Sequence, residues 1–203
     1  MSPEPIRASD VAELRRRTGA GMMDCKKALT EAEGDMDKAV EILRVEGLAK
    51  SAKLGAREAT EGLVQSYIHG TGKIGVLVEI DSNTDFVARS DEVQEFARDV
   101  AMHVAALSPL YVSEEEVPED VRDGEKRIFA AQAEAEGKPE QVREKMAEGR
   151  LRKWMEDNVL LNQVHVNQDK YEGQTLEQIR AALSAKTGEN VVVRRFTRFE
   201  VGA

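Results

Sequence analysis

The chain has 203 residues, enough for one or two domains with a hydrophobic core. Its formal net charge of -9 argues against a nucleic-acid-binding protein, because affinity for phosphates depends on clustered lysine and arginine. Cys25 is the only cysteine, which excludes an intrachain disulfide and any zinc site built from several cysteines. The sequence has no secretory signal and no apolar run of about 18 residues, so we expect a cytoplasmic protein that binds no membrane.

Residues 6–47 have the pattern of three short amphipathic helices separated by glycines. Gly19 and Gly34 are expected to end the first two helices, because glycine readily adopts the left-handed conformation found there. The expected N-caps are Ser9 or Asp10 for the first helix and Asp35 or Asp37 for the third. The pattern therefore predicts a compact three-helix module, and we assign residues 1–47 to it as the N-terminal domain.

Residues 48–62 are rich in alanine, lysine and glycine and contain few large apolar side chains. This composition favours a helical linker over a part of the core. We therefore expect the N-terminal module to move relative to residues 63–203, which are assigned to the core and dimerisation domain.

A change of hydrophobic period at Leu63 predicts a β-hairpin. Apolar and polar side chains alternate up to Ile68, residues 70–73 supply a glycine-containing turn, and alternation resumes from Ile74 to Ile80. A long helix is then expected from Ser90 or Asp91 to the Pro109 stop. Its apolar face, expected to cover the sheet, consists of Val93, Phe96, Ala97, Val100, Val104 and Leu107.

The rest of the chain predicts further helices and a last strand. Residues 113–116 fit a capping box, and a helical hairpin at about 118–156 is divided by Gly137-Lys138-Pro139. The other expected elements are an extended segment near Leu160 to Val166, a helix from the capping box at Thr175 to Thr187, and a strand from Val191 to Val201. The predicted fold is α+β, with a three-stranded antiparallel sheet backed by helices.

Two motifs carry a resemblance to a known family. Leu14 to Leu29 reads LRRRTGAGMMDCKKAL, and Thr84 to Arg89 reads TDFVAR. With KPEQVREKMAEGRLRK and the terminal RFEVG, these segments resemble the elongation factor Ts family over essentially the whole chain. The resemblance implies a UBA-like N-terminal module and a guanine-nucleotide exchange factor that binds elongation factor Tu, dislocates its Mg²⁺ and promotes GDP release. Such a protein is not an enzyme and needs no cofactor.

The chain has one hairpin-plus-helix unit where longer family members carry a related second one, so it resembles the short form of the family. A missing half-core favours closed two-fold association through exposed sheet edges and apolar faces. We therefore expect a homodimer.

The resemblance assigns the contact with elongation factor Tu to Thr84, Asp85, Phe86 and Val87, with Phe86 entering the GTPase domain as a wedge. From the residues alone, the alternative is that Phe86 anchors the core while Thr84 or Asp85 caps a helix. Burying one phenylalanine contributes about 1.5 to 3 kcal/mol, too little to displace a tightly held nucleotide. More contacts are needed.

A second contact is expected in the N-terminal module, at Arg15, Arg17, Gly19, Met22 and Met23. A glycine loop there can present an apolar tip to a partner. The alternative is that the methionines pack inside the module.

Other constellations give no site. His69, His103 and His165 share no ligand spacing, so we expect no metal. The glycines at 70, 72 and 75 lack the GKS or GKT sequence and the following helix of a phosphate loop, and the acidic run at 114–116 is typical of a solvated face. The alternative function is a UBA-like protein-interaction adaptor without exchange activity, for which the TDFVAR segment has no use.

Overall fold

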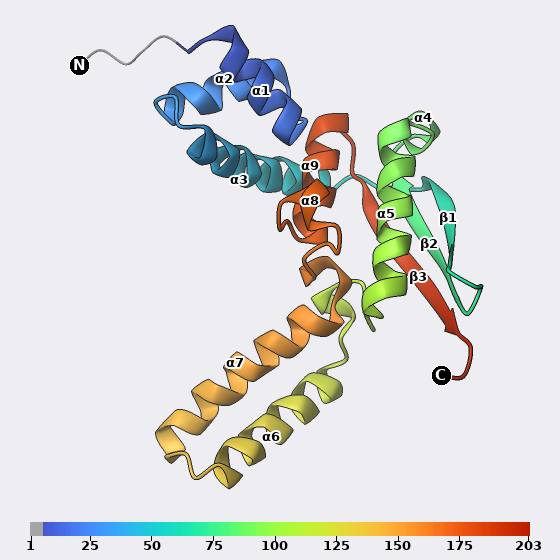
Figure 1. Ribbon diagram of the computed structural model, residues 1–203. Coiled ribbons are helices and arrows are strands. Elements are labelled where there is room, and N and C mark those ends of the chain that lie inside the picture. Colours follow the sequence, from blue (N-terminus) through green and yellow to red (C-terminus); the bar gives the residue numbers. More distant parts are fainter. Residues whose placement is uncertain (1–5) are drawn as a thin grey trace. The chain divides into compact units, whose positions relative to one another are not determined.

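A computed structural model describes residues 6–203 (Figure 1). The chain divides into two compact units, and the strands of the sheet and one long helix run through both. Unit 1 comprises the residues up to Gln65, Val78–Asp99 and Glu177–Arg194, and unit 2 comprises Ser66–Leu77, Val100–Leu176 and Arg195–Ala203. Among the described residues, no helix combines the length and the apolar character needed to span a membrane.

Unit 1 begins with the three predicted helices, α1 (Ala8–Thr18), α2 (Met22–Glu31) and α3 (Met36–Leu54). Asp35 caps α3, because its carboxylate accepts hydrogen bonds from the backbone N–H groups of Asp37 and Lys38. The cap predicted for α1 is wrong. The helix begins at Ala8, so Ser9 and Asp10 lie inside it, and the Asp10 carboxylate accepts a 3.1 Å bond from Arg7 instead.

One small core joins these helices. Leu14, Cys25 and Leu29 are fully buried at its centre. The other buried members are Val11, Ala28, Ala32, Ala39, Val40 and Leu43. The spacing of these residues on each helix is three or four, which places them on one face and explains why glycine-separated helices collapse together.

The segment predicted as a linker is more closely packed than its composition indicated. Helix α3 continues through Leu54, and Ser51, Leu54 and Ala59 are all buried. The Ser51 hydroxyl accepts a 3.2 Å bond from Arg180. Small side chains can pack closely against a neighbouring helix, which a count of large apolar residues overlooks. The domain boundaries 1–47, 48–62 and 63–203 remain a prediction.

The sheet is confirmed as a three-stranded antiparallel sheet in the order β1-β2-β3, with β1 at Glu61–His69, β2 at Ile74–Ser82 and β3 at Val192–Glu200. Val76, Val78 and Ile80 are buried on one face of the central strand. Gly62 permits a close approach of β1 to β2, since a Cβ atom there would lie 2.5 Å from the Ile80 carbonyl oxygen.

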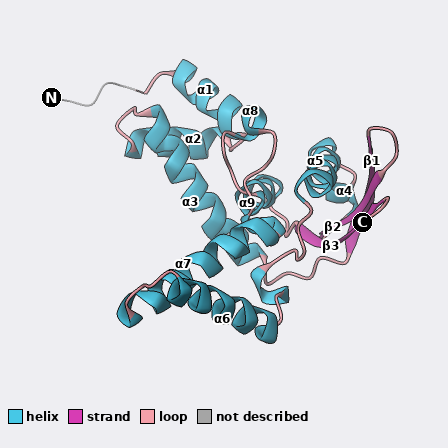
Figure 2. Ribbon diagram, turned by 60° about the horizontal axis from the view of Figure 1, so that its bottom comes forward, coloured by secondary structure: helices cyan, strands magenta, loops and turns pink. Residues whose placement is uncertain are grey.

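Helix α5 (Asp91–Leu107) lies alongside the sheet in both views (Figures 1 and 2). Its predicted apolar face is buried from Val93 to Val104, but Leu107, the last residue, is 45% exposed. In unit 2, Arg198 of β3 donates a 3.4 Å hydrogen bond to the Ala105 carbonyl of α5. This bond links the end of the helix to the third strand.

Unit 2 contains the predicted helical hairpin, α6 (Glu119–Ala135) and α7 (Glu140–Asn158) (Figure 1). The capping box at 113–116 is wrong, because residues 114–116 form the short 3-10 helix η1 and Ser113 makes no cap. Glu116 instead accepts a 2.9 Å bond from the Val112 N–H, one residue before the Ser113 N–H that the box requires.

The extended segment predicted near Leu160 to Val166 is also wrong. It contains the 3-10 helix η2 (Leu160–Asn162) and a single antiparallel bridge between Val164 and Thr175. Two helices follow it, α8 (Gln168–Tyr171) and α9 (Leu176–Thr187). An apolar run without a partner strand has no ladder to join, and local turns satisfy its backbone instead.

Candidate functional site

The TDFVAR motif forms the short helix α4 (Asp85–Ala88), between β2 and α5. We call residues Thr84–Arg89 the wedge turn. Thr84 caps α4, since its hydroxyl oxygen accepts a 3.3 Å bond from the Val87 N–H. Within the turn, Val87 and Ala88 are buried, whereas the Phe86 side chain is 83% exposed.

This exposure decides between the two interpretations of Phe86. A core anchor would be buried, so that alternative is wrong, although the accompanying prediction of Thr84 as a cap is confirmed. Asp85 is not the cap and forms a 2.7 Å ion pair with Arg89 one turn later. Val87 faces the interior of the free chain and anchors the turn. An apolar ring held out in water costs free energy unless a partner covers it.

Distant segments hold the wedge turn in place. The Glu189 carboxylate accepts a 3.0 Å bond from the Thr84 N–H and a 2.7 Å bond from the Thr84 hydroxyl. Beside it, the Asn83 side chain accepts a 2.8 Å bond from the Asn190 N–H and donates a 2.6 Å bond to the Glu58 carbonyl. The Asn190 amide donates a 2.9 Å bond to the Arg57 carbonyl.

We call these hydrogen bonds, which join residues 57–58, 83–84 and 189–190, the latch. Glu189 and Asn190 were not predicted from the sequence. Both lie more than a hundred residues beyond the motif that they contact, at separations of 105 and 107 positions. No local pattern can reveal such a pairing, because side-chain contacts across that distance are set by the packing of unit 1.

The second predicted site, in the three-helix module, is a loop that we call the tip, Gly19–Met23. Gly19 adopts φ +69°, a left-handed conformation in which glycine is favoured, and its N–H donates to the Arg15 carbonyl. The Met22 and Met23 side chains are 58% and 74% exposed, so the alternative that they pack inside the module is wrong.

The two arginines near the tip differ in their surroundings. The Arg15 side chain is exposed to solvent. Arg17 forms a 3.3 Å ion pair with Asp37 of α3. Burial raises the pKa of the Cys25 thiol, whose Sγ lies 3.7 Å from the Ala20 carbonyl oxygen beneath the tip. A buried thiol with a raised pKa is poorly reactive, so Cys25 has a packing role.

The histidines have structural roles in unit 2. His103 Nδ1 accepts a 3.2 Å bond from the Val166 N–H, so Nε2 carries the proton and donates a 2.9 Å bond to Gln163 Oε1. The Asn167 N–H donates to His165 Nδ1 at 3.0 Å. Burial lowers the pKa of His103 to about 4. The described residues contain no group of three or more side chains that could hold a metal ion.

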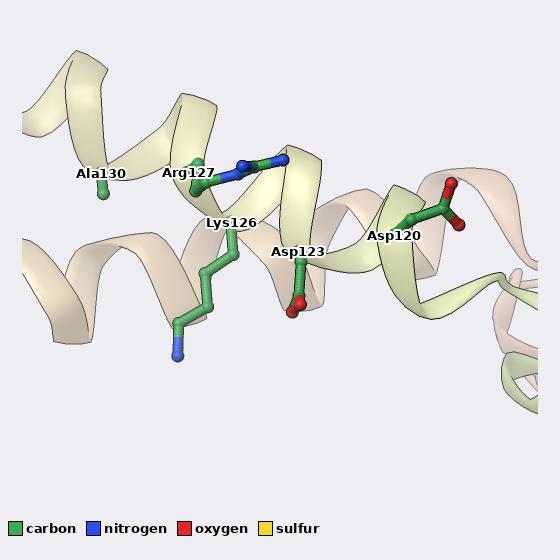
Figure 3. A pocket seen from close by; sticks show the side chains of 5 residues that line it. All are labelled: Asp120, Asp123, Lys126, Arg127 and Ala130. Carbon is green, nitrogen blue, oxygen red and sulfur yellow. The ribbon is translucent and has the colours of Figure 1, made fainter.

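A pocket of about 520 Å³ lies on the helical hairpin, lined by Asp120, Asp123, Lys126, Arg127 and Ala130 of α6 (Figure 3). Two acidic residues, Asp120 and Asp123, precede two basic residues along α6, and Figure 3 shows the Asp120 and Lys126 side chains pointing in different directions. Charges that do not converge favour neither an anion nor a cation. The wedge turn and the tip therefore remain the candidate sites.

Comparison with known proteins gives one consistent result. The family model described as Elongation factor TS matches residues 7–172. Among curated relatives named Elongation factor Ts, the protein of Carboxydothermus hydrogenoformans is 55% identical, over 97% of this chain and 89% of its own length. That of Moorella thermoacetica is 53% identical, over 97% of this chain and 96% of its own. That of Caldanaerobacter subterraneus is 51% identical, over 97% of both chains. The chain therefore belongs to the elongation factor Ts family of translation elongation factors.

Proposed function

We propose that this protein is a guanine-nucleotide exchange factor for elongation factor Tu and acts in the cytoplasm. It binds the GDP form of that partner, dislocates the Mg²⁺ ion and promotes release of GDP, so that GTP can bind. The observation that carries the proposal is the Phe86 ring, 83% exposed on a turn whose backbone is anchored on both sides. Together with membership of the family, it supports a wedge that is ready before the partner arrives.

The wedge needs a second contact. Burial of one phenylalanine side chain contributes about 1.5 to 3 kcal/mol, or about ten- to a hundredfold in affinity. We propose that the tip supplies additional affinity through Met22 and Met23, whose flexible side chains adapt to an apolar groove. The exposed Arg15 adds positive charge to this contact, and Arg17 joins it once its ion pair with Asp37 opens.

Exchange then follows from linkage and requires no catalytic residue. A factor that binds the nucleotide-free partner most tightly lowers the affinity for nucleotide by the same ratio, and nucleotide in turn expels the factor. The Mg²⁺ that is dislocated belongs to the partner, where it bridges the phosphates of the bound nucleotide. We accordingly propose no enzymatic reaction and no cofactor for this chain.

We also propose that the protein is a homodimer. In unit 2, Ile68, Leu77 and Phe199 come from the three strands of the sheet and are 63%, 46% and 70% exposed. A second copy would cover these side chains symmetrically. Sedimentation equilibrium should give twice the mass of one chain for the wild type and one mass for Leu77→Lys; a wild-type monomer at micromolar concentration would contradict the proposal.

The exchange activity is tested by release of a fluorescent GDP analogue from elongation factor Tu of the same organism. The assay compares the wild type, Phe86→Ala, Leu110→Ala and no addition. Leu110 is a matched control, since its side chain is apolar and 61% exposed but belongs to unit 2 and follows the last residue of α5, whereas the wedge turn precedes the first.

We expect the wild type and Leu110→Ala to accelerate release equally, and Phe86→Ala to lose most of the acceleration. Circular dichroism should give the same melting curve for all three proteins. If the wild type binds the partner and leaves GDP release unchanged, the chain is an interaction adaptor and the proposal fails.

A further inference from the structure

The cap of α4 depends on a proton that Glu189 accepts. The Thr84 hydroxyl lies 2.7 Å from Glu189 Oε1 and 3.3 Å from the Val87 nitrogen. A carboxylate can only accept, so the hydroxyl hydrogen points to Glu189 and a lone pair of the same oxygen faces the Val87 N–H. The second carboxylate oxygen accepts the Thr84 N–H at 3.0 Å. Glu189 therefore selects the one hydroxyl orientation in which Thr84 caps the turn.

Helix α4 cannot hold this geometry by itself. It has four residues, and an isolated helix of that length is unstable in water. Phe86 is 83% exposed and gains almost no packing that would fix the direction of its ring. The backbone of α4 therefore sets the direction of the ring. That backbone is fixed by the buried Val87 and Ala88 and by the Thr84 cap.

Glu189 is itself well anchored. The next residue, Asn190, is buried and donates hydrogen bonds to Asn83 and to the Arg57 carbonyl. On the other side, the Gly188 carbonyl accepts a 3.2 Å bond from Arg57. A carboxylate held between two such attachments has a defined position, which it can impose on Thr84.

We propose that Glu189 is the positioning residue of the wedge, which orients Phe86 for its partner without touching that partner's nucleotide. This inference rests on the proposed exchange function and adds a residue from the loop between α9 and β3 to the working site. It predicts that Glu189 acts only through Phe86. Substitution of Glu189 should then slow GDP release when Phe86 is present and leave the rate unchanged when Phe86 is absent.

The test is a double-mutant cycle on the rate of GDP release, with the wild type, Glu189→Ala, Phe86→Ala and the double variant. We expect Glu189→Ala to lower the acceleration about tenfold, the order of effect associated with a lost charge-assisted hydrogen bond. In the Phe86→Ala background the same change should have an effect of less than about twofold. Glu189→Gln keeps one acceptor oxygen but sets an NH₂ donor against the second Thr84 donor, so it should recover only a small part of the rate.

A matched control separates positioning from general stability. Glu177 is also a partly exposed glutamate of unit 1 with two short bonds, both to Arg180 at 2.6 and 2.7 Å, but it does not touch the wedge turn. The positioning role is wrong if Glu177→Ala slows GDP release as much as Glu189→Ala. It is also wrong if the fold-losses in rate for Glu189→Ala and Phe86→Ala multiply in the double variant.

Amide hydrogen exchange tests the same inference without the partner. In Glu189→Ala, we expect the amides of Thr84 and Val87 to exchange at least about tenfold faster, while those of the α1–α3 core keep their wild-type rates. Unchanged amide exchange rates at Thr84 and Val87 would overturn the inference, even if Phe86→Ala abolishes the acceleration of GDP release. A different result would overturn the proposed function alone. In that case the wild type fails to accelerate GDP release, while the amides of Thr84 and Val87 exchange faster in Glu189→Ala.

Discussion

The tip and the wedge turn both expose apolar side chains, but the chain holds them in different ways. At the tip, the framing bonds are local: the Thr18 hydroxyl donates to the Leu14 carbonyl, and the Cys25 N–H donates to the Gly21 carbonyl. A buried core lies directly beneath. At the wedge turn, the framing bonds come from the latch, whose partners are separated by 105 and 107 residues. One site depends on its own helices, and the other depends on the assembly of unit 1.

Removing core from beneath the tip should have the largest effect. Leu29 is fully buried in the three-helix module, and Leu29→Ala should cost about 2 to 5 kcal/mol of its unfolding free energy. We expect the tip to lose its structure while Thr84 and Val87 remain protected from amide exchange. Urea denaturation with residue-resolved hydrogen exchange measures both. Loss of protection at the wedge turn in this variant would show that the two sites are not held independently.

Acid should lower the stability of unit 2. Burial lowers the pKa of His103 to about 4, below its ordinary 6.5, so the folded state favours the neutral ring. This contribution is fully present above pH 6.5, falls as the pH drops from 6.5 toward 4, and is on the order of 3 kcal/mol. His103→Gln should flatten the dependence of unfolding free energy on pH in this window, and an unchanged slope would contradict the assignment.

Breaking the latch should have a smaller effect, confined to the wedge. Asn190→Ala leaves the Arg57 carbonyl without the side-chain donor that now lies 2.9 Å away, a loss of about 1 to 3 kcal/mol. We expect faster amide exchange from Asn83 to Val87 and no change at the tip. Thermal unfolding and hydrogen exchange test this, with Asn167→Ala as a control amide from unit 2. Equal loosening of the tip would remove the distinction between the two sites.

The smallest effect on stability is expected at the exposed side chains themselves. Met23 is 74% exposed, so Met23→Ala should change the unfolding free energy by less than about 0.5 kcal/mol. Under the proposed function it should raise the concentration of factor needed for half-maximal GDP release severalfold. A large loss of stability in this variant would mean that the methionine packs in solution, contrary to its exposure here.

Much of the fold follows from short-range patterns. The glycines at 19 and 34, the Asp35 cap and the period-two alternation from Leu63 predicted the module and the hairpin, because caps, turns and amphipathic faces depend on residues a few positions apart. The predictions that failed concern sequence patterns compatible with more than one local structure. The acidic run at 114–116 made a 3-10 helix in place of a capping box, and the apolar segment after Leu160 found no partner strand.

The sequence by itself determined the family, the α+β class and which residues are candidates for partner contact, since these are carried by motifs and by local periodicity. Only the tertiary structure decided that Phe86 faces solvent, because exposure depends on what packs nearby and not on residue type. Only the tertiary structure placed Glu189 against Thr84. Hydrogen bonds between segments a hundred residues apart form because the whole of unit 1 brings them together, and no local pattern encodes that distance.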